Sequence, residues 1–259
     1  NTGFSLADVS VSNSADTCMV FPDSSTVTWI GGSATDCNTH AYAGQGAVDT
    51  GSGSTIWIEN VDFTDSAVNG IYGTASSLSL SNVSLDASGM PTQQTGTAVA
   101  QTSTANSGTS ISVSNVSASN YVAALTSHAT DSLSIEGMSS TGDTNGYWFT
   151  PSGASSTTIG DVGWTMDDVS ADGGMTMART MPLSMDNVDL GGELKFSGTG
   201  PSNDWLTGKS VQAKGLTVNG CGWKIDFAGV DLGDASNGAD SWVSANCGST
   251  TSSNLVTVA

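Results

Sequence analysis

Apolar and polar residues alternate along short stretches of this chain, and a single small residue interrupts the alternation at intervals. The stretch 55–63 alternates up to Asn60 and then begins a second short alternating run. Alternation with a period of two predicts β-strands with one face in a core. The pattern recurs at 78–85, 111–118 and 183–190, and in degenerate form at 4–9, 133–138 and 164–169. A strand, a one-residue corner and a second strand, repeated along a chain, predict a solenoid.

The corner residue belongs to a small set of residue types. A one-residue bend between strands requires a left-handed backbone, which Gly, Asn and Asp adopt at the lowest cost. The predicted corners are Asp8, Gly32, Asn60, Asn82, Asn115, Gly137, Asp168, Asn187 and Gly215. Successive corners lie 19 to 33 residues apart. In a stacked solenoid the polar corner side chains lie above one another, which predicts a hydrogen-bonded ladder. Its expected members are Asn60, Asn82, Asn115, Asp168 and Asn187.

Two corner asparagines also match the acceptor pattern for N-linked glycans, in Asn82-Val-Ser84 and Asn115-Val-Ser117. Two interpretations are therefore open for these positions. Either the amides carry glycans, or they are buried in the ladder and unavailable. We favour burial, because Asn60 and Asn187 occupy equivalent corners without being part of such a motif.

A further short strand, usually opened by glycine, lies between successive corners. Its copies are 70–72, 96–99, 146–149, 174–177 and 192–196. Each repeat is therefore expected to hold three short strands, which stack into three parallel sheets around a narrow core. The longest excursion, 90–108, is expected to form an exposed loop. Alternation points aliphatic residues inward and mostly serine outward, with Trp57 as the exception on the outer face.

Coils of this length with asparagine at a tight corner resemble the right-handed parallel β-helix of the pectate-lyase-like superfamily. The resemblance covers roughly residues 4–258 and predicts one all-β domain over 1–259. It implies polysaccharide cleavage, but the chain departs from the catalytic patterns of that group. Its lyases use a basic residue beside calcium, whereas the first Arg or Lys here is Arg179.

The hydrolases of the same group carry adjacent aspartates, a Gly-His-Gly sequence and an Arg-x-Lys sequence. Asp167-Asp168 is present, but neither His40 nor His128 is flanked by glycines, and no lysine follows Arg179 at the required spacing. Asp168 is also a predicted corner. We therefore predict no catalytic residues.

The net charge of the chain limits the classes of molecule that it is expected to bind. The chain has 24 acidic residues against 5 Lys and Arg, a net charge of −19. Such a surface repels nucleic acid and anionic membranes, and it suits cations or serves solubility. No stretch approaches the ~20 apolar residues of a membrane span, so we expect no direct membrane insertion.

The four cysteines form two pairs that are close in sequence, near opposite ends of the chain. We predict disulfides Cys18–Cys37 and Cys221–Cys247, because cysteines about one repeat apart fall on adjacent coils. The alternative is four reduced thiols. Disulfides indicate an oxidising compartment, which favours an extracellular or cell-surface location.

Two kinds of ligand remain candidates. Oxygen-rich corners suit calcium, and the paired aspartates that could supply them are Asp62 with Asp65, Asp186 with Asp189, and Asp231 with Asp234. Exposed aromatic rings can stack on sugars. Trp57 is one candidate, and Trp148 is another if Tyr147 and Phe149 fill the core. Ice binding by a hydroxyl array ranks lower, because the outward positions are irregular.

The sequence therefore predicts a non-catalytic extracellular solenoid, structural or adhesive, such as a subunit of a surface layer or filament. The alternative is a carbohydrate-active enzyme or carbohydrate-binding module that acts on polysaccharide. Both ends of the chain have the sequence of interrupted repeats, at 4–9 and 253–259. An uncapped strand edge invites pairing with another chain, so we expect end-to-end self-association.

Overall fold

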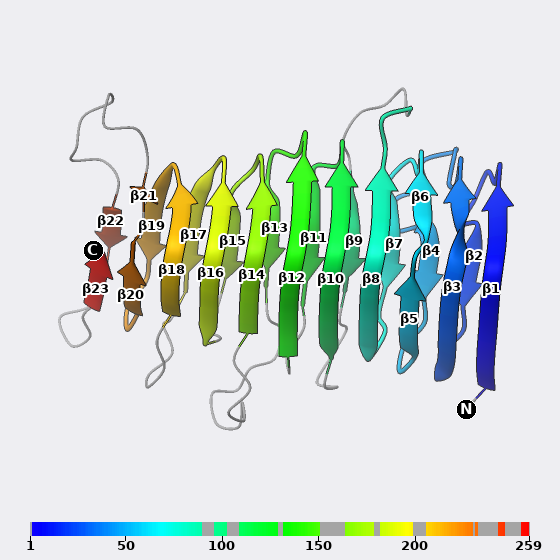
Figure 1. Cartoon of the computed structure of the whole chain (residues 1–259), viewed down its shortest axis with the longest axis horizontal. Helices are drawn as coiled ribbons and strands as arrows, with labels where there is room; N and C mark the ends of the chain where they lie inside the picture. The colour runs from blue at the N-terminus through cyan, green and yellow to red at the C-terminus, as the bar shows by residue number, and fades with distance from the viewer. Residues whose placement is uncertain are drawn as a thin grey trace.

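All regular elements of the described chain are β-strands, and their pairings are parallel. The computed structural model describes residues 2–89, 96–102, 109–128, 132–150, 164–178, 182–198, 206–229, 231–232, 243–246 and 255–258. The strands stack side by side into an elongated rod, with β1 (Thr2–Ser12) at one end and β23 (Leu255–Val258) at the other (Figure 1). The predicted all-β parallel solenoid is confirmed.

One strand from each coil enters a 13-stranded sheet, here called the long sheet, in the order β1-β3-β5-β8-β10-β12-β14-β16-β18-β20-β23. Two short strands, β6 and β21, pair beside this path. The further members are β3 (Ser25–Thr35), β5 (Thr55–Glu59), β6 (Asp62–Thr64), β8 (Ser77–Asp86), β10 (Ser110–Ser119), β12 (Ser132–Thr141), β14 (Trp164–Ala171), β16 (Leu183–Leu190), β18 (Leu206–Ala213), β20 (Lys224–Ala228) and β21 (Asp231–Leu232).

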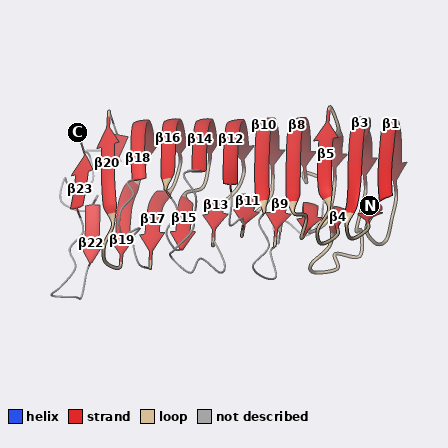
Figure 2. Ribbon diagram, turned by 90° about the horizontal axis from the view of Figure 1, so that it is seen from below, coloured by secondary structure: helices blue, strands red, loops and turns tan. Residues whose placement is uncertain are grey.

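The other strands form a 10-stranded sheet, the short sheet, which makes a second layer against the first (Figure 2). Its members are β2 (Met19–Phe21), β4 (Gly46–Thr50), β7 (Asn69–Gly73), β9 (Thr97–Gln101), β11 (Ala123–Ser127), β13 (Gly146–Phe149), β15 (Met175–Ala178), β17 (Glu193–Ser197), β19 (Gly215–Asn219) and β22 (Val243–Asn246). The predicted glycine-opened strands are β7, β9, β13, β15 and β17. The predicted loop 90–108 is wrong in its middle, because β9 lies there.

The expectation of three sheets is also wrong. Strands before and after the corner are one continuous strand in most coils, as in β8, which runs through Asn82. Hydrogen-bonded register is kept on both sides of that corner, where Ser81 pairs with Ser114 and Val83 with Val116. The corner therefore bends the long sheet without dividing it. In two of the described coils the long strand is split, into β5 and β6 in the third coil and into β20 and β21 in the tenth.

The corner also shifts the phase of the alternation by one residue. In β10, Ile111 and Val113 are buried before the corner, and Val116 and Ala118 are buried after it. Two consecutive residues, including Asn115, point outward between them. Both arms of the bent strand thus present apolar residues to the same core, which runs along the rod as stacked columns. One such column is Val27, Ile56, Leu78, Ile111, Leu133, Trp164, Leu183, Leu206 and Ile225.

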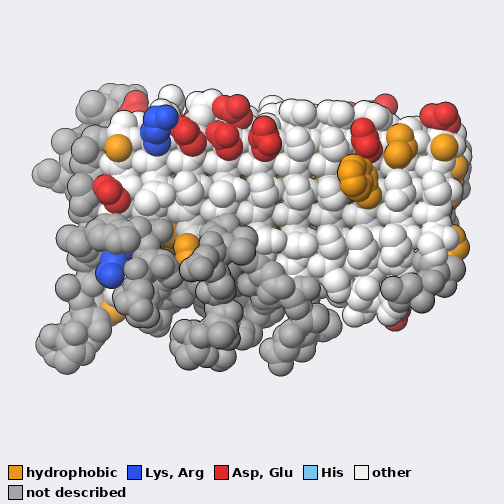
Figure 3. All heavy atoms as spheres, turned by 60° about the horizontal axis from the view of Figure 1, so that its bottom comes forward, with side chains coloured by type: hydrophobic (Ala, Val, Ile, Leu, Met, Phe, Trp, Pro, Cys, Tyr) orange, Lys and Arg blue, Asp and Glu red, His pale blue; other side chains and the backbone are white. Residues whose placement is uncertain are grey.

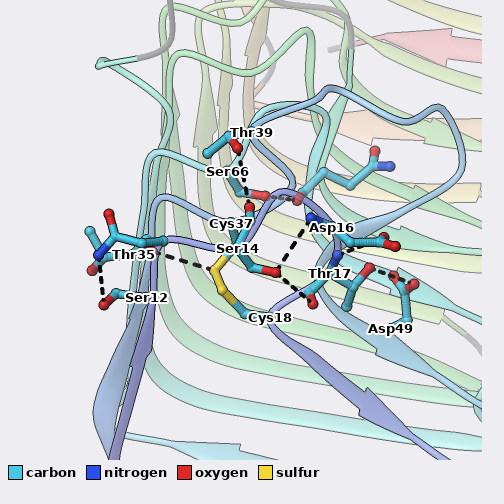
Figure 4. Close-up of a disulfide and its surroundings, with 12 residues drawn as sticks. Ser12, Ser14, Asp16, Thr17, Cys18, Thr35, Cys37, Thr39, Asp49 and Ser66 are labelled. Atoms are coloured by element: carbon cyan, nitrogen blue, oxygen red, sulfur yellow. Dashed lines mark hydrogen bonds between the residues drawn. A yellow bond between two sulfur atoms is a disulfide. The ribbon is translucent and has the colours of Figure 1, made fainter.

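The disulfide Cys18–Cys37 is formed, as predicted, and joins the first two coils. Cys18 lies between β1 and β2 and Cys37 between β3 and β4. Figure 4 shows the disulfide and, near it, the hydrogen bond that Thr17 Oγ1 donates to Asp49 Oδ2 at 2.8 Å. The side chain of Cys37 is fully buried. Cys221 is disulfide-bonded, and its predicted partner Cys247 lies outside the described residues.

The stacked columns predict that a single inward truncation destabilises the whole stack. Ile111→Ala should lower the free energy of unfolding by about 2–5 kcal/mol, because it removes a fully buried side chain and leaves a cavity. Ser112→Ala, on the exposed side of the same strand, should change it by less than about 0.5 kcal/mol. Urea denaturation followed by circular dichroism measures both. Equal effects of the two variants would contradict the assignment of inward and outward faces.

Candidate functional site

A ridge of left-handed corner residues runs along the outside of the long sheet. Register places one such residue in each of ten successive coils, all with positive φ between 50° and 75°. They are Asp8, Gly31, Asn60, Asn82, Asn115, Gly137, Asp168, Asn187, Ser210 and Gly229. The sequence misplaced two of them: Gly31 rather than Gly32 aligns with Asp8, and Ser210 takes the place predicted for Gly215, which begins β19.

The corner side chains are exposed, so the predicted burial of Asn82 and Asn115 is wrong. Each side chain lies on the convex side of the bend, where it points away from the core. Side-chain bonds between successive coils occur at two steps of the ridge. Asn82 Nδ2 donates to Asn60 Oδ1 at 3.2 Å, and Asn187 Nδ2 donates to Asp168 Oδ1. The described ladder is thus discontinuous and lies on the surface.

Five residues after the first corner, the sequence analysis missed a second row of left-handed residues. Its members are Asn13, Asp36, Asp65, Asn120 and Gly142, with φ between 52° and 72°. The residue types again tolerate this backbone. The signal was present in the sequence, at a fixed distance of five from the first corner, but no alternating strand follows it to mark a corner.

A carboxylate network around Asp86 lies beside the second row and includes its member Asn120. Asp86 accepts hydrogen bonds from Ser119 Oγ at 2.7 Å, from Asn120 Nδ2 at 2.9 Å and from the hydroxyl and backbone of Ser88. Desolvation by burial raises the pKa of Asp86, but these hydrogen bonds together outweigh it and hold the pKa below the ordinary carboxyl value. The network ties β8 to the coil of β10.

Hydroxyl groups dominate the outer face of the long sheet. One outward row, three residues before the corner, contains Ser5, Thr28, Trp57, Ser79, Ser112, Ser134, Thr165, Ser184, Thr207 and Asp226. Neighbouring coils share hydroxyl hydrogen bonds, such as Thr165 to Ser134 at 3.3 Å. Figure 3 shows this uncharged face with a row of acidic side chains along one side.

Both candidate sugar-stacking tryptophans are exposed, but they lie on different faces. Trp57 is 50% exposed on β5, in the long sheet between Thr28 and Ser79. Trp148 is 48% exposed on β13, in the short sheet between Thr126 and Thr176. Each ring therefore stands between hydroxyl side chains of adjacent strands. In agreement with the alternation, Tyr147 and Phe149 are fully buried.

The candidate calcium ligands lie in different surroundings. Asp62 lies on an outward row, whereas Asp65 belongs to the second corner row and accepts the backbone N–H of Gly89. Asp186 faces Lys209, whose Nζ lies 3.5 Å from Asp186 Oδ2, and the corner Asn187 and the buried Val188 lie between Asp186 and Asp189 in the sequence.

The structure instead brings Asp189 and Asp231 to one shallow groove of about 260 Å³, which Gln212 and Lys214 also line. Asp234 lies outside the described residues. Within the described ranges, no group of three or more His, Cys, Asp or Glu side chains is placed to hold a metal ion.

The adjacent aspartates Asp167 and Asp168 are divided between two roles. Asp168 is a corner and accepts the Asn187 amide, while Asp167 lies on the neighbouring outward row, opposite Asp186. His128 Nε2 lies 3.0 Å from Thr150 Oγ1 on the short sheet, and desolvation lowers its pKa. His128 and the aspartates thus lie on different sheets.

Exposed large apolar side chains gather near the N-terminal end of the rod (Figure 3). Those in the first 57 residues are Phe4, Val20, Ile30, Tyr42 and Trp57, and Trp148 is the one other in the described chain. Phe4, 44% exposed, occupies the inward column that is fully buried one coil later at Val27. Leu6, Val9 and Val11, also inward on β1, are only partly buried. Among the described residues, the inward side chains of β1 are thus less covered than those of β3, and we call this the open end of the core.

Comparison with known proteins identified no family for this chain. No family model matches it, and neither a curated protein nor a solved structure gives a match. The described part of the chain contains no helix that could cross a membrane.

The Asp86 network predicts a specific acid dependence of stability. Because the folded-state pKa of Asp86 is lowered, its contribution is complete above the unfolded pKa of about 4 and is lost as pH falls below it. Asp86→Asn should therefore destabilise the protein at pH 7, and the difference from wild type should shrink between about pH 5 and pH 2. Asp62→Asn, which removes an exposed carboxylate outside the network, is the control. Chemical denaturation across this pH range measures the slopes, and a constant difference would contradict the network.

Proposed function

We propose that this chain is a structural or adhesive β-solenoid of an extracellular surface, where it serves as a subunit of a layer or filament. The open apolar end of the core at β1 carries this proposal. β1 pairs with β3 and with no other described strand, so one of its backbone edges faces outward. An edge strand beside exposed core residues favours pairing with a further coil.

The proposed occupant of that end is the far end of a second copy. Register puts Val256 and Val258 of β23 in line with Ile225 and Phe227, and so at the column positions of Phe4 and Leu6. A copy stacked on β1 would therefore continue both apolar columns. A head-to-tail contact of this kind does not close on itself, and it generates a filament.

Charge also favours a head-to-tail arrangement. All five Lys and Arg residues lie at or after position 179, whereas the acids are spread along the whole chain. Stacking the end that carries Lys224 against the end that carries Asp8 brings opposite charges together, whereas stacking two N-terminal ends would bring together acids and no Lys or Arg. With a net charge of −19, cations such as calcium would weaken repulsion between filaments that lie side by side.

The handedness of the coil, its superfamily and the location of the protein are part of the same proposal. The right-handed coil and the kinship with the pectate-lyase-like superfamily are inferred from the corner pattern. The extracellular location is inferred from the Cys18–Cys37 disulfide, because disulfides persist in oxidising compartments.

The assembly is testable with an inward charge on the edge strand. Leu6→Lys places an ammonium group in the column that a second copy would continue, so it should reduce end-to-end association at least tenfold. Ser112→Lys adds the same charge to the exposed side of β10 and should leave association unchanged. Sedimentation velocity and negative-stain electron microscopy across protein and calcium concentrations measure both. A wild-type protein that stays monomeric throughout, with circular dichroism showing intact folding, would overturn the proposal.

A second candidate function is polysaccharide binding, which the two exposed tryptophans favour. An aromatic ring beside hydroxyl groups offers a stacking surface and hydrogen bonds for a sugar. Because Trp57 and Trp148 lie on different sheets, a single flat chain of sugars would contact only one of them.

This candidate function predicts that one of the two tryptophans contributes most of the affinity for polysaccharide. If polysaccharide binding is the function, Trp57→Ala or Trp148→Ala should weaken it at least tenfold, and the other substitution should have little effect. Thr28→Ala and Thr126→Ala, beside each ring, are the matched controls. Affinity electrophoresis against neutral and acidic polysaccharides measures the change. Equal retention of all four variants and the wild type in every gel would exclude this function.

A further inference from the structure

The two glycan-acceptor motifs lie on the exposed corner ridge, so the fold leaves both of them accessible. Asn82 and Asn115 each occupy a corner on the convex side of a long strand, with exposed side chains. The motif serines, Ser84 and Ser117, lie two residues further along the same outward side. A substituent on either asparagine would therefore point away from the core and displace no packed side chain.

Hydrogen bonding distinguishes the two asparagines. Asn82 Nδ2 donates to Asn60 Oδ1 at 3.2 Å, so this amide is held within the ridge. Asn115 has no side-chain hydrogen bond to any residue of the described chain. Its neighbour on the next coil is Gly137, which has no side chain to extend the ladder. The Asn115 amide is thus exposed and unengaged on both sides.

We propose that Asn115 is an N-glycosylation site and that the ladder bond protects Asn82. In the transfer, a bond forms between Asn115 Nδ2 and C1 of a sugar, and the bond from C1 to the diphosphate of a lipid-linked glycosyl donor breaks. The lipid diphosphate leaves with the bonding electrons. The amide proton passes to a base of the transferase. The co-reactant is therefore a diphosphate-activated sugar presented by an oligosaccharyltransferase.

The position of Asn115 suits a bulky substituent. Its coil lies near the middle of the rod (Figure 1), away from the open end at β1, so a glycan there would leave end contacts accessible. Gly137 also removes the side chain that would otherwise stand beside the first sugar. This inference is independent of the proposed assembly.

The discriminating experiment compares folded and unfolded chains. The folded, disulfide-intact protein is incubated with a purified oligosaccharyltransferase, active on a motif peptide, and a lipid-diphosphate-linked sugar. Glycopeptide mass spectrometry then gives the occupancy at each site. Occupancy at Asn115 should exceed that at Asn82 about threefold or more in the folded chain, as expected when one modest hydrogen bond must break. In the reduced, denatured chain the ratio should fall toward one.

Two ridge variants test the physical reason. Asn60→Gly keeps a residue that tolerates the left-handed corner but removes the acceptor of Asn82, so occupancy at Asn82 should rise toward that of Asn115. Gly137→Asn offers a donor to Asn115 Oδ1 but no acceptor to Asn115 Nδ2, which is the atom that is glycosylated, so occupancy at Asn115 should stay above that at Asn82.

Asn115→Gln must abolish the Asn115 glycopeptide and leave Asn82 unchanged. Equal or greater occupancy at Asn82 in the folded wild type overturns the proposal. So does the lack of any modification at Asn115 by a transferase that modifies the motif peptide.

Discussion

A single residue with positive φ in the middle of each long strand is the constraint on which this structure depends. It makes two consecutive residues point outward, as Ser81 and Asn82 do in β8, so that Val83 and the residues after it return to the core side. Without that shift, one arm of each strand would expose its apolar residues. Left-handed backbone costs most residues roughly 1–2 kcal/mol, which explains why Asn, Asp and Gly fill all but one of the ten corners.

The corner and the alternation could be predicted from sequence because both are local requirements. The exceptions are corners that the local sequence does not identify. Ser210 carries a positive φ of 53° although serine rarely adopts it, and its register with Asn187 identifies it as a corner only once the neighbouring coil is in place. The same holds for Gly31, since Gly31 and Gly32 both have positive φ and the sequence alone does not separate them.

The direction of the bend could not be predicted from the sequence. That direction determines whether the corner residues of the candidate site are buried or exposed. A corner residue on the concave side would be buried in the core, as expected for Asn82 and Asn115. On the convex side it is exposed, and its hydrogen bonds compete with water. Such bonds add little to stability, so the apolar columns carry the fold and the ridge remains available for surface chemistry. Asp86 was missed for a related reason, because its partners Ser119 and Asn120 lie one coil away.

The side chains on the faces of the rod differ in character from those at its N-terminal end. Hydroxyls on the long face hydrogen-bond to one another between coils, as Ser33 does to Ser10 and Ser110 to Ser77. Acids such as Asp167 and Asp186 line the ridge beside them, so two rods lying side by side with their ridges together would repel each other. Phe4 lies instead at an open column of the core. Because apolar burial is the main favourable term in association, contact at that end gains the most while it brings the fewest like charges together.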